Sequence, residues 1–227
     1  MPRQFWGYYD NGTYRVGCNG ATVWVYDQSD ALLKRFHDIP YAYCGAFQPG
    51  SNNFVAKSTA GLLAVYDLDQ LDCLKTIHCG FDGGQDEGFA FSTDKELFYN
   101  VQKPTELSTE IGIYRTKDYQ LVNRLFSNDD LMAFDEIEFS ELGECYVLGF
   151  MRDSKNKVLD YGFVGILNND EIINIKTMSE NDFNYLSDCF WWKRSGFSDK
   201  VLETYTACNR RGKRLHEVSL EALYKSL

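Results

Sequence analysis

A pair of short strand-like runs recurs along most of the chain, and this repeat restricts the fold more than any other feature of the sequence. The first run of each pair is rich in β-branched, aromatic and other apolar residues, and copies occupy 22–27, 62–67, 111–115 and 162–166. After a short turn, a second run follows each copy, at 31–36, 73–77, 120–125 and 171–175. Such runs, bounded by turn residues, favour β-strands. A weaker fifth copy spans 214–220.

Another pair of strand-like runs precedes each of these copies. Its first run ends near a phenylalanine, and the anchors Phe47, Phe91 and Phe139 lie 44 and 48 residues apart. Four strands in a unit of this length are typical of one propeller blade. We therefore predict an all-β fold, a five-bladed β-propeller of four-stranded antiparallel blades. It forms a single domain over 1–227, with blades at 1–38, 39–79, 80–127, 128–179 and 180–227.

The last predicted blade is expected to be incomplete. Its strands are assigned to 190–192, 201–205 and 214–220, and the residues at 221–225 are expected to form a helical turn. A β-sandwich is the alternative fold, although sandwiches rarely repeat one four-stranded unit five times.

The turns and strand ends of the units resemble those of WD-repeat propellers. The resemblance rests on Phe-Gln-Pro-Gly at 47–50, Phe-Ser-Thr-Asp at 91–94 and Val-Tyr-Asp at 25–27, and it extends over nearly the whole chain. No unit contains a Trp-Asp dipeptide or a Gly-His pair, so the sequence resembles a degenerate member of that class. The resemblance implies a binding module that assembles with other proteins.

Charge and cysteine usage exclude several function classes. Asp and Glu number 33 against 23 Lys and Arg, a net charge of −10, which argues against nucleic-acid binding because phosphate contacts need cations. The seven cysteines contain no Cys-x-x-Cys pair, so we expect buried free thiols, no metal site and no cofactor. The N-terminal residues lack the apolar core of a signal peptide, and no run is long enough to cross a membrane. We expect a cytoplasmic protein.

The predicted connections between blades carry the strongest functional pattern. They span 79–88, 127–136 and 178–188, would share one face of a propeller, and contain no Lys or Arg. Carboxylates there would attract a basic partner, and aromatic side chains would anchor it. The predicted partner-binding residues are Asp82, Asp86, Glu87, Asp129, Asp130, Phe134, Asp135, Glu136, Asp182, Phe183 and Tyr185. Of these, Asp82, Asp86 and Glu87 are expected to be exposed and unpaired.

These features predict a protein-binding module that is not an enzyme. In kind, the chain resembles the bacterial immunity proteins of contact-dependent growth inhibition, which neutralise toxins. That resemblance implies a basic partner, such as a secreted nuclease toxin domain whose active site an acidic face would cover. Two alternatives stay open: a generic scaffold for complex assembly, and a carbohydrate-active propeller enzyme with carboxylates such as Asp135 or Asp188 near a central pocket.

Overall fold

The computed structural model describes residues 5–83, 87–127, 131–152, 158–194 and 219–227. They form four separate antiparallel sheets, and in each sheet the four strands pair in chain order. The first sheet holds β1 (Gly7–Asp10), β2 (Tyr14–Cys18), β3 (Val23–Asp27) and β4 (Leu32–Phe36). The second holds β5 (Ala42–Phe47), β6 (Asn53–Ser58), β7 (Leu62–Asp67) and β8 (Asp72–His78).

The other two sheets repeat this plan. The third holds β9 (Phe89–Phe91), β10 (Leu97–Gln102), β11 (Glu110–Arg115) and β12 (Leu121–Leu125). The fourth holds β13 (Met132–Phe139), β14 (Cys145–Arg152), β15 (Val158–Asn168) and β16 (Glu171–Ser179). The all-β, propeller-like architecture predicted from the repeat is therefore confirmed. Each of the first four predicted blade spans contains one of these sheets.

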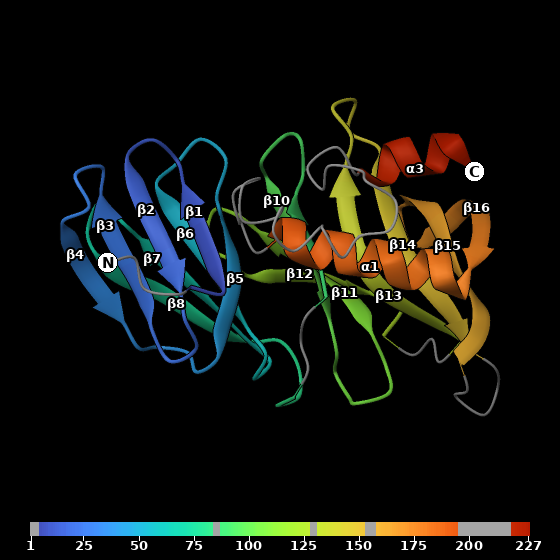
Figure 1. Cartoon of the computed structure of the whole chain (residues 1–227), viewed down its shortest axis with the longest axis horizontal. Helices are drawn as coiled ribbons and strands as arrows, with labels where there is room; N and C mark the ends of the chain where they lie inside the picture. Colours follow the sequence, from blue (N-terminus) through green and yellow to red (C-terminus); the bar gives the residue numbers. More distant parts are fainter. Residues whose placement is uncertain (1–4, 84–86, 128–130, 153–157, 195–218) are drawn as a thin grey trace.

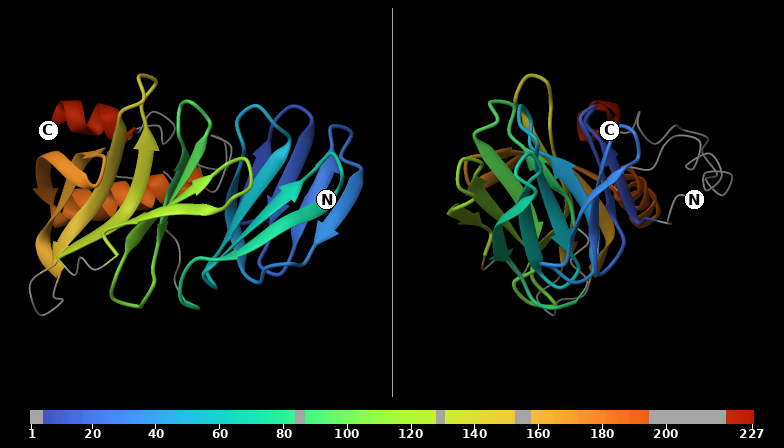
Figure 2. Two further views of the ribbon diagram at one scale, coloured as in Figure 1. Left: turned by 180° about the vertical axis from the view of Figure 1, so that it is seen from behind. Right: turned by 90° about the vertical axis from the view of Figure 1, so that its left-hand side faces the viewer.

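The blade number predicted from the sequence is wrong, because the described residues form four sheets and these do not close into a ring. The sheets stand side by side in chain order, from blue to orange in Figure 1. In place of strands, the described part of the fifth span has two helices, α1 (Glu180–Arg194) and α3 (Leu220–Ser226). Viewed along the long axis, α1 lies on the same side of the molecule as the first sheet (Figure 2).

Helical periodicity explains why the residues assigned to a strand at 190–192 belong to a helix. Phe183, Leu186 and Phe190 are spaced by three and four residues, so they share one face of a helix, and all three are buried. Ser179 caps the first turn by accepting a hydrogen bond from the Asp182 amide at 3.2 Å. The helical turn expected at 221–225 is confirmed as part of α3. The strand predicted at 201–205 lies outside the described residues, as do residues 214–218 of the strand predicted at 214–220. The last two residues of that strand are not extended, because Ser219 is the N-cap and Leu220 the first residue of α3.

The second, third and fourth sheets are each packed on both faces, and the alternation of side chains along a strand shows how. On β14, Cys145 and Val147 face the third sheet, whereas Tyr146 and Leu148 pack against the two helices. A first interface joins the first two sheets around Val16 and Phe54, and a second joins the next pair around Val65 and Phe98. The helices therefore cover the face of the fourth sheet that a further blade would cover in a larger propeller.

The six described cysteines are free thiols, as expected, and all but Cys73 are buried. Burial raises the pKa of Cys145 to about 12 and also raises the pKa of Cys18. A thiol held in its protonated form is a poor nucleophile, so these two groups serve as apolar packing. In the part of the chain that the structure describes, neither helix has the length and apolar character needed to span a membrane.

Candidate partner-binding groove

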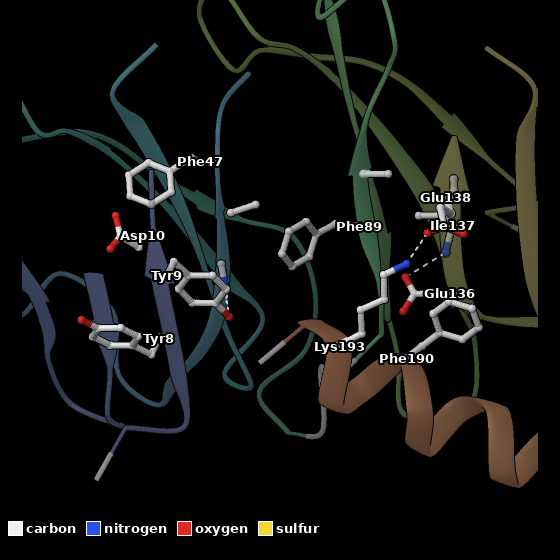
Figure 3. Close-up of a pocket in the computed structure, with 13 residues that line it drawn as sticks. Tyr8, Tyr9, Asp10, Phe47, Phe89, Glu136, Ile137, Glu138, Phe190 and Lys193 are labelled. Carbon is white, nitrogen blue, oxygen red and sulfur yellow. Dashed lines mark hydrogen bonds and ion pairs between the residues drawn. The ribbon is translucent and has the colours of Figure 1, made fainter. Parts of the chain in front are cut away.

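The first strands of all four sheets meet at one groove with a volume of about 490 Å³. Figure 3 shows aromatic and charged side chains facing each other across it. One wall comes from β1 and β5, and the other comes from β9, β13 and α1. The lining residues are Tyr8, Tyr9, Asp10, Gly45, Ala46, Phe47, Phe89, Ala90, Glu136, Ile137, Glu138, Phe190 and Lys193.

Two glutamates reach the groove from β13. Glu136 and Glu138 are two residues apart on one strand, so both side chains project from the same face of the sheet. Glu136 is only 3% exposed. One of its carboxylate oxygens accepts a hydrogen bond from the Ile137 amide at 3.0 Å, and the carboxylate lies directly against Gly88. A side chain at position 88 would occupy the same space, so this glycine makes room for the acid.

A lysine from α1 already places a cation in the groove. The Lys193 Nζ donates to Glu138 Oε1 at 2.5 Å, and the Leu220 amide at the start of α3 donates to Glu138 Oε2 at 2.6 Å. Lys193 Nζ also lies 5.5 Å from the centroid of the Phe190 ring. Glu138 therefore connects β13 to both helices. Figure 3 shows the Lys193 side chain reaching from α1 toward Glu136 and Glu138.

The opposite wall is mainly aromatic. The Gly45 amide donates to the Tyr9 hydroxyl at 2.9 Å, and the Tyr9 ring packs on Phe54, with 5.3 Å between centroids. Asp10 accepts hydrogen bonds from the Gly12 amide and from Gln28, and the first of these is the main reason why its pKa lies below the usual range. Arg15 Nε also donates to Asp10, at 3.0 Å. The groove thus combines three carboxylates with one lysine.

The structure places the predicted partner-binding residues in different environments. Asp82 is exposed, and Asp135, Asp182 and Tyr185 are partly exposed. Asp86, Asp129 and Asp130 lie outside the described residues. Among the predicted residues that the structure describes, Glu136 alone lines the groove, and neither Asp135 nor Asp188 does.

The prediction that Glu87 is exposed and unpaired is wrong. Glu87 is 4% exposed, and it forms an ion pair with Lys103. The fully buried Lys57 donates to the backbone oxygens of Glu87 and Val101, each at 2.7 Å. Burial raises the pKa of Glu87 despite the attraction of these two lysines. Glu87 is held inward because two lysines meet it, Lys57 from β6 and Lys103, which directly follows β10.

Phe134 and Phe183 are not surface anchors, and Glu136 is not a surface acid. Phe134 is 1% exposed and packs on Phe126, with 4.8 Å between ring centroids. Phe183 is 8% exposed and packs on Phe150 and against the backbone of Gly162. Two of the predicted connections, 127–136 and 178–188, include residues that belong to regular elements. Residues 132–136 belong to β13, and residues 180–188 belong to α1, so their aromatic side chains turn into the cores.

Most groove residues were missed by the sequence-based prediction, although a usable signal was present. The first strand of each repeated unit was recognised, and in a propeller-like array this strand borders the centre. Residues of these strands that face the centre include Tyr9, Phe47, Phe89 and Glu138. The contribution of Lys193 could not be found in this way, because its segment was assigned to a strand of a fifth blade.

Comparisons with known proteins support the fold and leave the function open. No protein-family model matches the chain, and no curated protein matches it. A chain of Kuenenia stuttgartiensis Hydrazine Synthase is similar in structure, with a TM-score of 0.60 and 14% sequence identity. The match covers 75% of this chain and 47% of that one, so this chain corresponds to less than half of its length. At this identity the likeness concerns the fold alone.

Among the residues that the structure describes, no group of three or more His, Cys, Asp or Glu side chains is arranged to hold a metal ion. The acids of the groove instead meet aromatic rings and a lysine. Such a combination is suited to binding an organic cation, because carboxylates attract it and ring faces stabilise it further.

Proposed function

We propose that the protein is a non-catalytic binding module for a basic protein partner, and that the groove receives a cationic side chain of that partner. The observation that carries the proposal is the groove itself, which Glu136 and Glu138 line together with aromatic residues that include Tyr9 and Phe89. A net charge of −10 would add long-range attraction for such a partner.

The specific form of this proposal is an immunity protein that neutralises a basic nuclease toxin. An anionic protein can compete with nucleic acid for a cationic active site, and this competition requires one tight complex. A scaffold, by contrast, would bind several partners more weakly. The stoichiometry and the number of partners therefore separate the two roles.

The test starts with a tagged pull-down from the native lysate and then uses the purified partner. We expect a one-to-one complex by size-exclusion chromatography with light scattering, and loss of nuclease activity when the complex forms. Glu136→Gln and Glu138→Gln should weaken the complex. Glu171→Gln is the matched control, because Glu171 is an exposed residue of β16 outside the groove. Equal binding by all three variants would refute a role for the groove.

A second candidate is carbohydrate binding or hydrolysis, because the groove places two carboxylates beside aromatic rings. Both oxygens of Glu138 already accept hydrogen bonds, from Lys193 and from the Leu220 amide, which leaves it poorly placed as a proton donor. Screening aryl glycosides and neutral oligosaccharides would test this role. Turnover that disappears in Glu136→Gln would replace the protein-binding proposal.

A further inference from the structure

The cation already present in the groove indicates which ligand chemistry the groove accepts. Lys193 extends from the last turn of α1, and its ammonium group reaches Glu138 with an N–O distance of 2.5 Å. The Lys193 side chain is 34% exposed, and that of Glu138 is 26% exposed. The pair is therefore accessible from solvent through the groove, and a competing cation can reach it.

We propose that the groove is a binding site for a guanidinium group, and that Lys193 is a built-in competitor which an arginine side chain displaces. This inference rests on the proposed function and names the group that the groove recognises. In the free protein, Lys193 neutralises Glu138 and holds α1 against β13. When an arginine enters, its guanidinium takes over Glu138, and Lys193 moves out toward solvent.

Two features favour guanidinium over ammonium. The Glu138 carboxylate is 26% exposed, and a guanidinium can pair with such a group through two parallel N–H donors, whereas an ammonium acts as a point charge. The second feature is the aromatic lining, which includes Tyr9 and Phe89. Guanidinium is more weakly hydrated than ammonium, and it stacks on ring faces.

Internal competition lowers the observed affinity by the fraction of molecules in which the site is open. If Lys193 occupies Glu138 in about nine molecules of ten, its removal should increase arginine affinity about tenfold. The predicted consequence is unusual for a binding site, because deleting a groove residue strengthens binding.

The probes are the peptide acetyl-Gly-Arg-Gly-amide and its citrulline and lysine counterparts, titrated into the full chain by NMR. Citrulline keeps the shape of arginine without its charge. We expect Lys193→Met to bind the arginine peptide about tenfold more tightly than the unsubstituted protein. Lys225→Met is the matched control, since Lys225 pairs with Glu221 on α3 away from the groove. Glu138→Gln combined with Lys193→Met should lose the gain.

Several results would overturn the inference. Lys193→Met could bind the arginine peptide no more tightly than the unsubstituted protein, or no variant could bind it at all. The citrulline peptide could also bind as tightly as the arginine peptide, or Lys193→Met could increase the affinity for the lysine peptide more than that for the arginine peptide. Lys193→Gln replaces the methionine variant if the latter does not fold. The macromolecular complex gives a separate answer. A partner that depends on Glu138 but binds Lys193→Met no better supports the proposed function and refutes the competitor role.

Discussion

At the scale of single residues, the carboxylates of this protein differ chiefly in how deeply they are buried. Asp27 at the end of β3 and Asp118 in a hairpin turn accept hydrogen bonds from neighbouring residues, from Ser29 and Arg115 respectively, and these bonds are the main reason why the pKa of each lies below its usual range. Glu87 and Glu136 are buried beside the inner strands. The turn acids stabilise local backbone, whereas the buried acids depend on the surrounding packing.

Gly88→Ala should disturb Glu136 directly. An added Cβ would meet the Glu136 Oε1 at 1.6 Å, so the carboxylate must leave its place and move into the groove. We expect a loss of about 1–3 kcal/mol in the free energy of unfolding, as for other overpacked sites. Urea denaturation measures this loss. Gly12→Ala is the comparison, because a Cβ there meets no atom within 4 Å, although its φ of +83° adds backbone strain. A smaller effect at Gly88 than at Gly12 would contradict the packing argument.

Lys103→Met should make stability depend more steeply on pH. Burial already raises the pKa of Glu87, and removing the attraction of Lys103 raises it further. A raised carboxyl pKa means that the folded state binds the proton more tightly than the unfolded chain. Stability is therefore retained at low pH and lost as pH rises through the folded pKa. We expect a loss of about 2 kcal/mol at pH 8 and a smaller loss at pH 4.

The double variant Glu87→Gln with Lys103→Met provides the control for that prediction. It removes the buried charge together with its partner, so it should be more stable at pH 8 than Lys103→Met alone. Chemical denaturation at both pH values gives the comparison. If the single and double variants lose the same stability at pH 8, the burial of a charged Glu87 is not the cause.

At the scale of elements, the four repeated units were predictable and the C-terminal region was not. Val-Tyr-Asp at 65–67 and its relatives mark strands that every sheet uses in the same position. In the fifth span, Phe190 and its two apolar neighbours are compatible with a strand over three residues. The apolar positions Phe183, Leu186 and Phe190, however, have the spacing of one helix face over eight residues. Short windows cannot separate these two periods, so the helix was missed.

Phe183→Ala tests the role of α1 as a cover for the fourth sheet. The Phe183 ring lies against Gly162 of β15 and packs on Phe150, so its removal leaves a cavity beneath the helix. We expect a loss of about 3–4 kcal/mol in the free energy of unfolding. Thermal and urea unfolding measure this loss.

Tyr185→Ala is the matched truncation on the same helix, where the side chain is only partly buried. It should cost distinctly less than Phe183→Ala. Unchanged stability of Phe183→Ala, together with faster dissociation from a bound partner, would instead support the prediction that Phe183 anchors a partner.

At the scale of the whole molecule, the position of the groove along the inner strands matters for partner binding. β1, β5 and β13 each begin at the end of the sheets where β8 finishes and β9 begins. They run toward the opposite end, where a hairpin turn leads each of them into the second strand of its sheet. Asp10 and Phe47 are the last residues of their strands, and Glu138 is the last but one of its strand. The groove therefore lies nearer the hairpin end than the acidic connections that the sequence singled out.

Charge reversal at the two ends should affect association unequally. The double variant Glu96→Lys with Glu141→Lys changes exposed acids in hairpin turns, and Asp82→Lys with Glu180→Lys changes exposed acids at the other end. Both double variants change the net charge by the same amount, so the comparison isolates the effect of position.

We expect the variant with changes at Glu96 and Glu141 to slow association with the proposed basic partner more, because these residues lie nearer the groove. Electrostatic steering weakens beyond a Debye length of about 8 Å at physiological salt. Stopped-flow rates at about 0.05 M and 0.5 M salt test this. A stronger effect of the Asp82 and Glu180 pair would place the partner on the acidic connections, and indifference of both pairs to salt would remove electrostatic steering from the proposal.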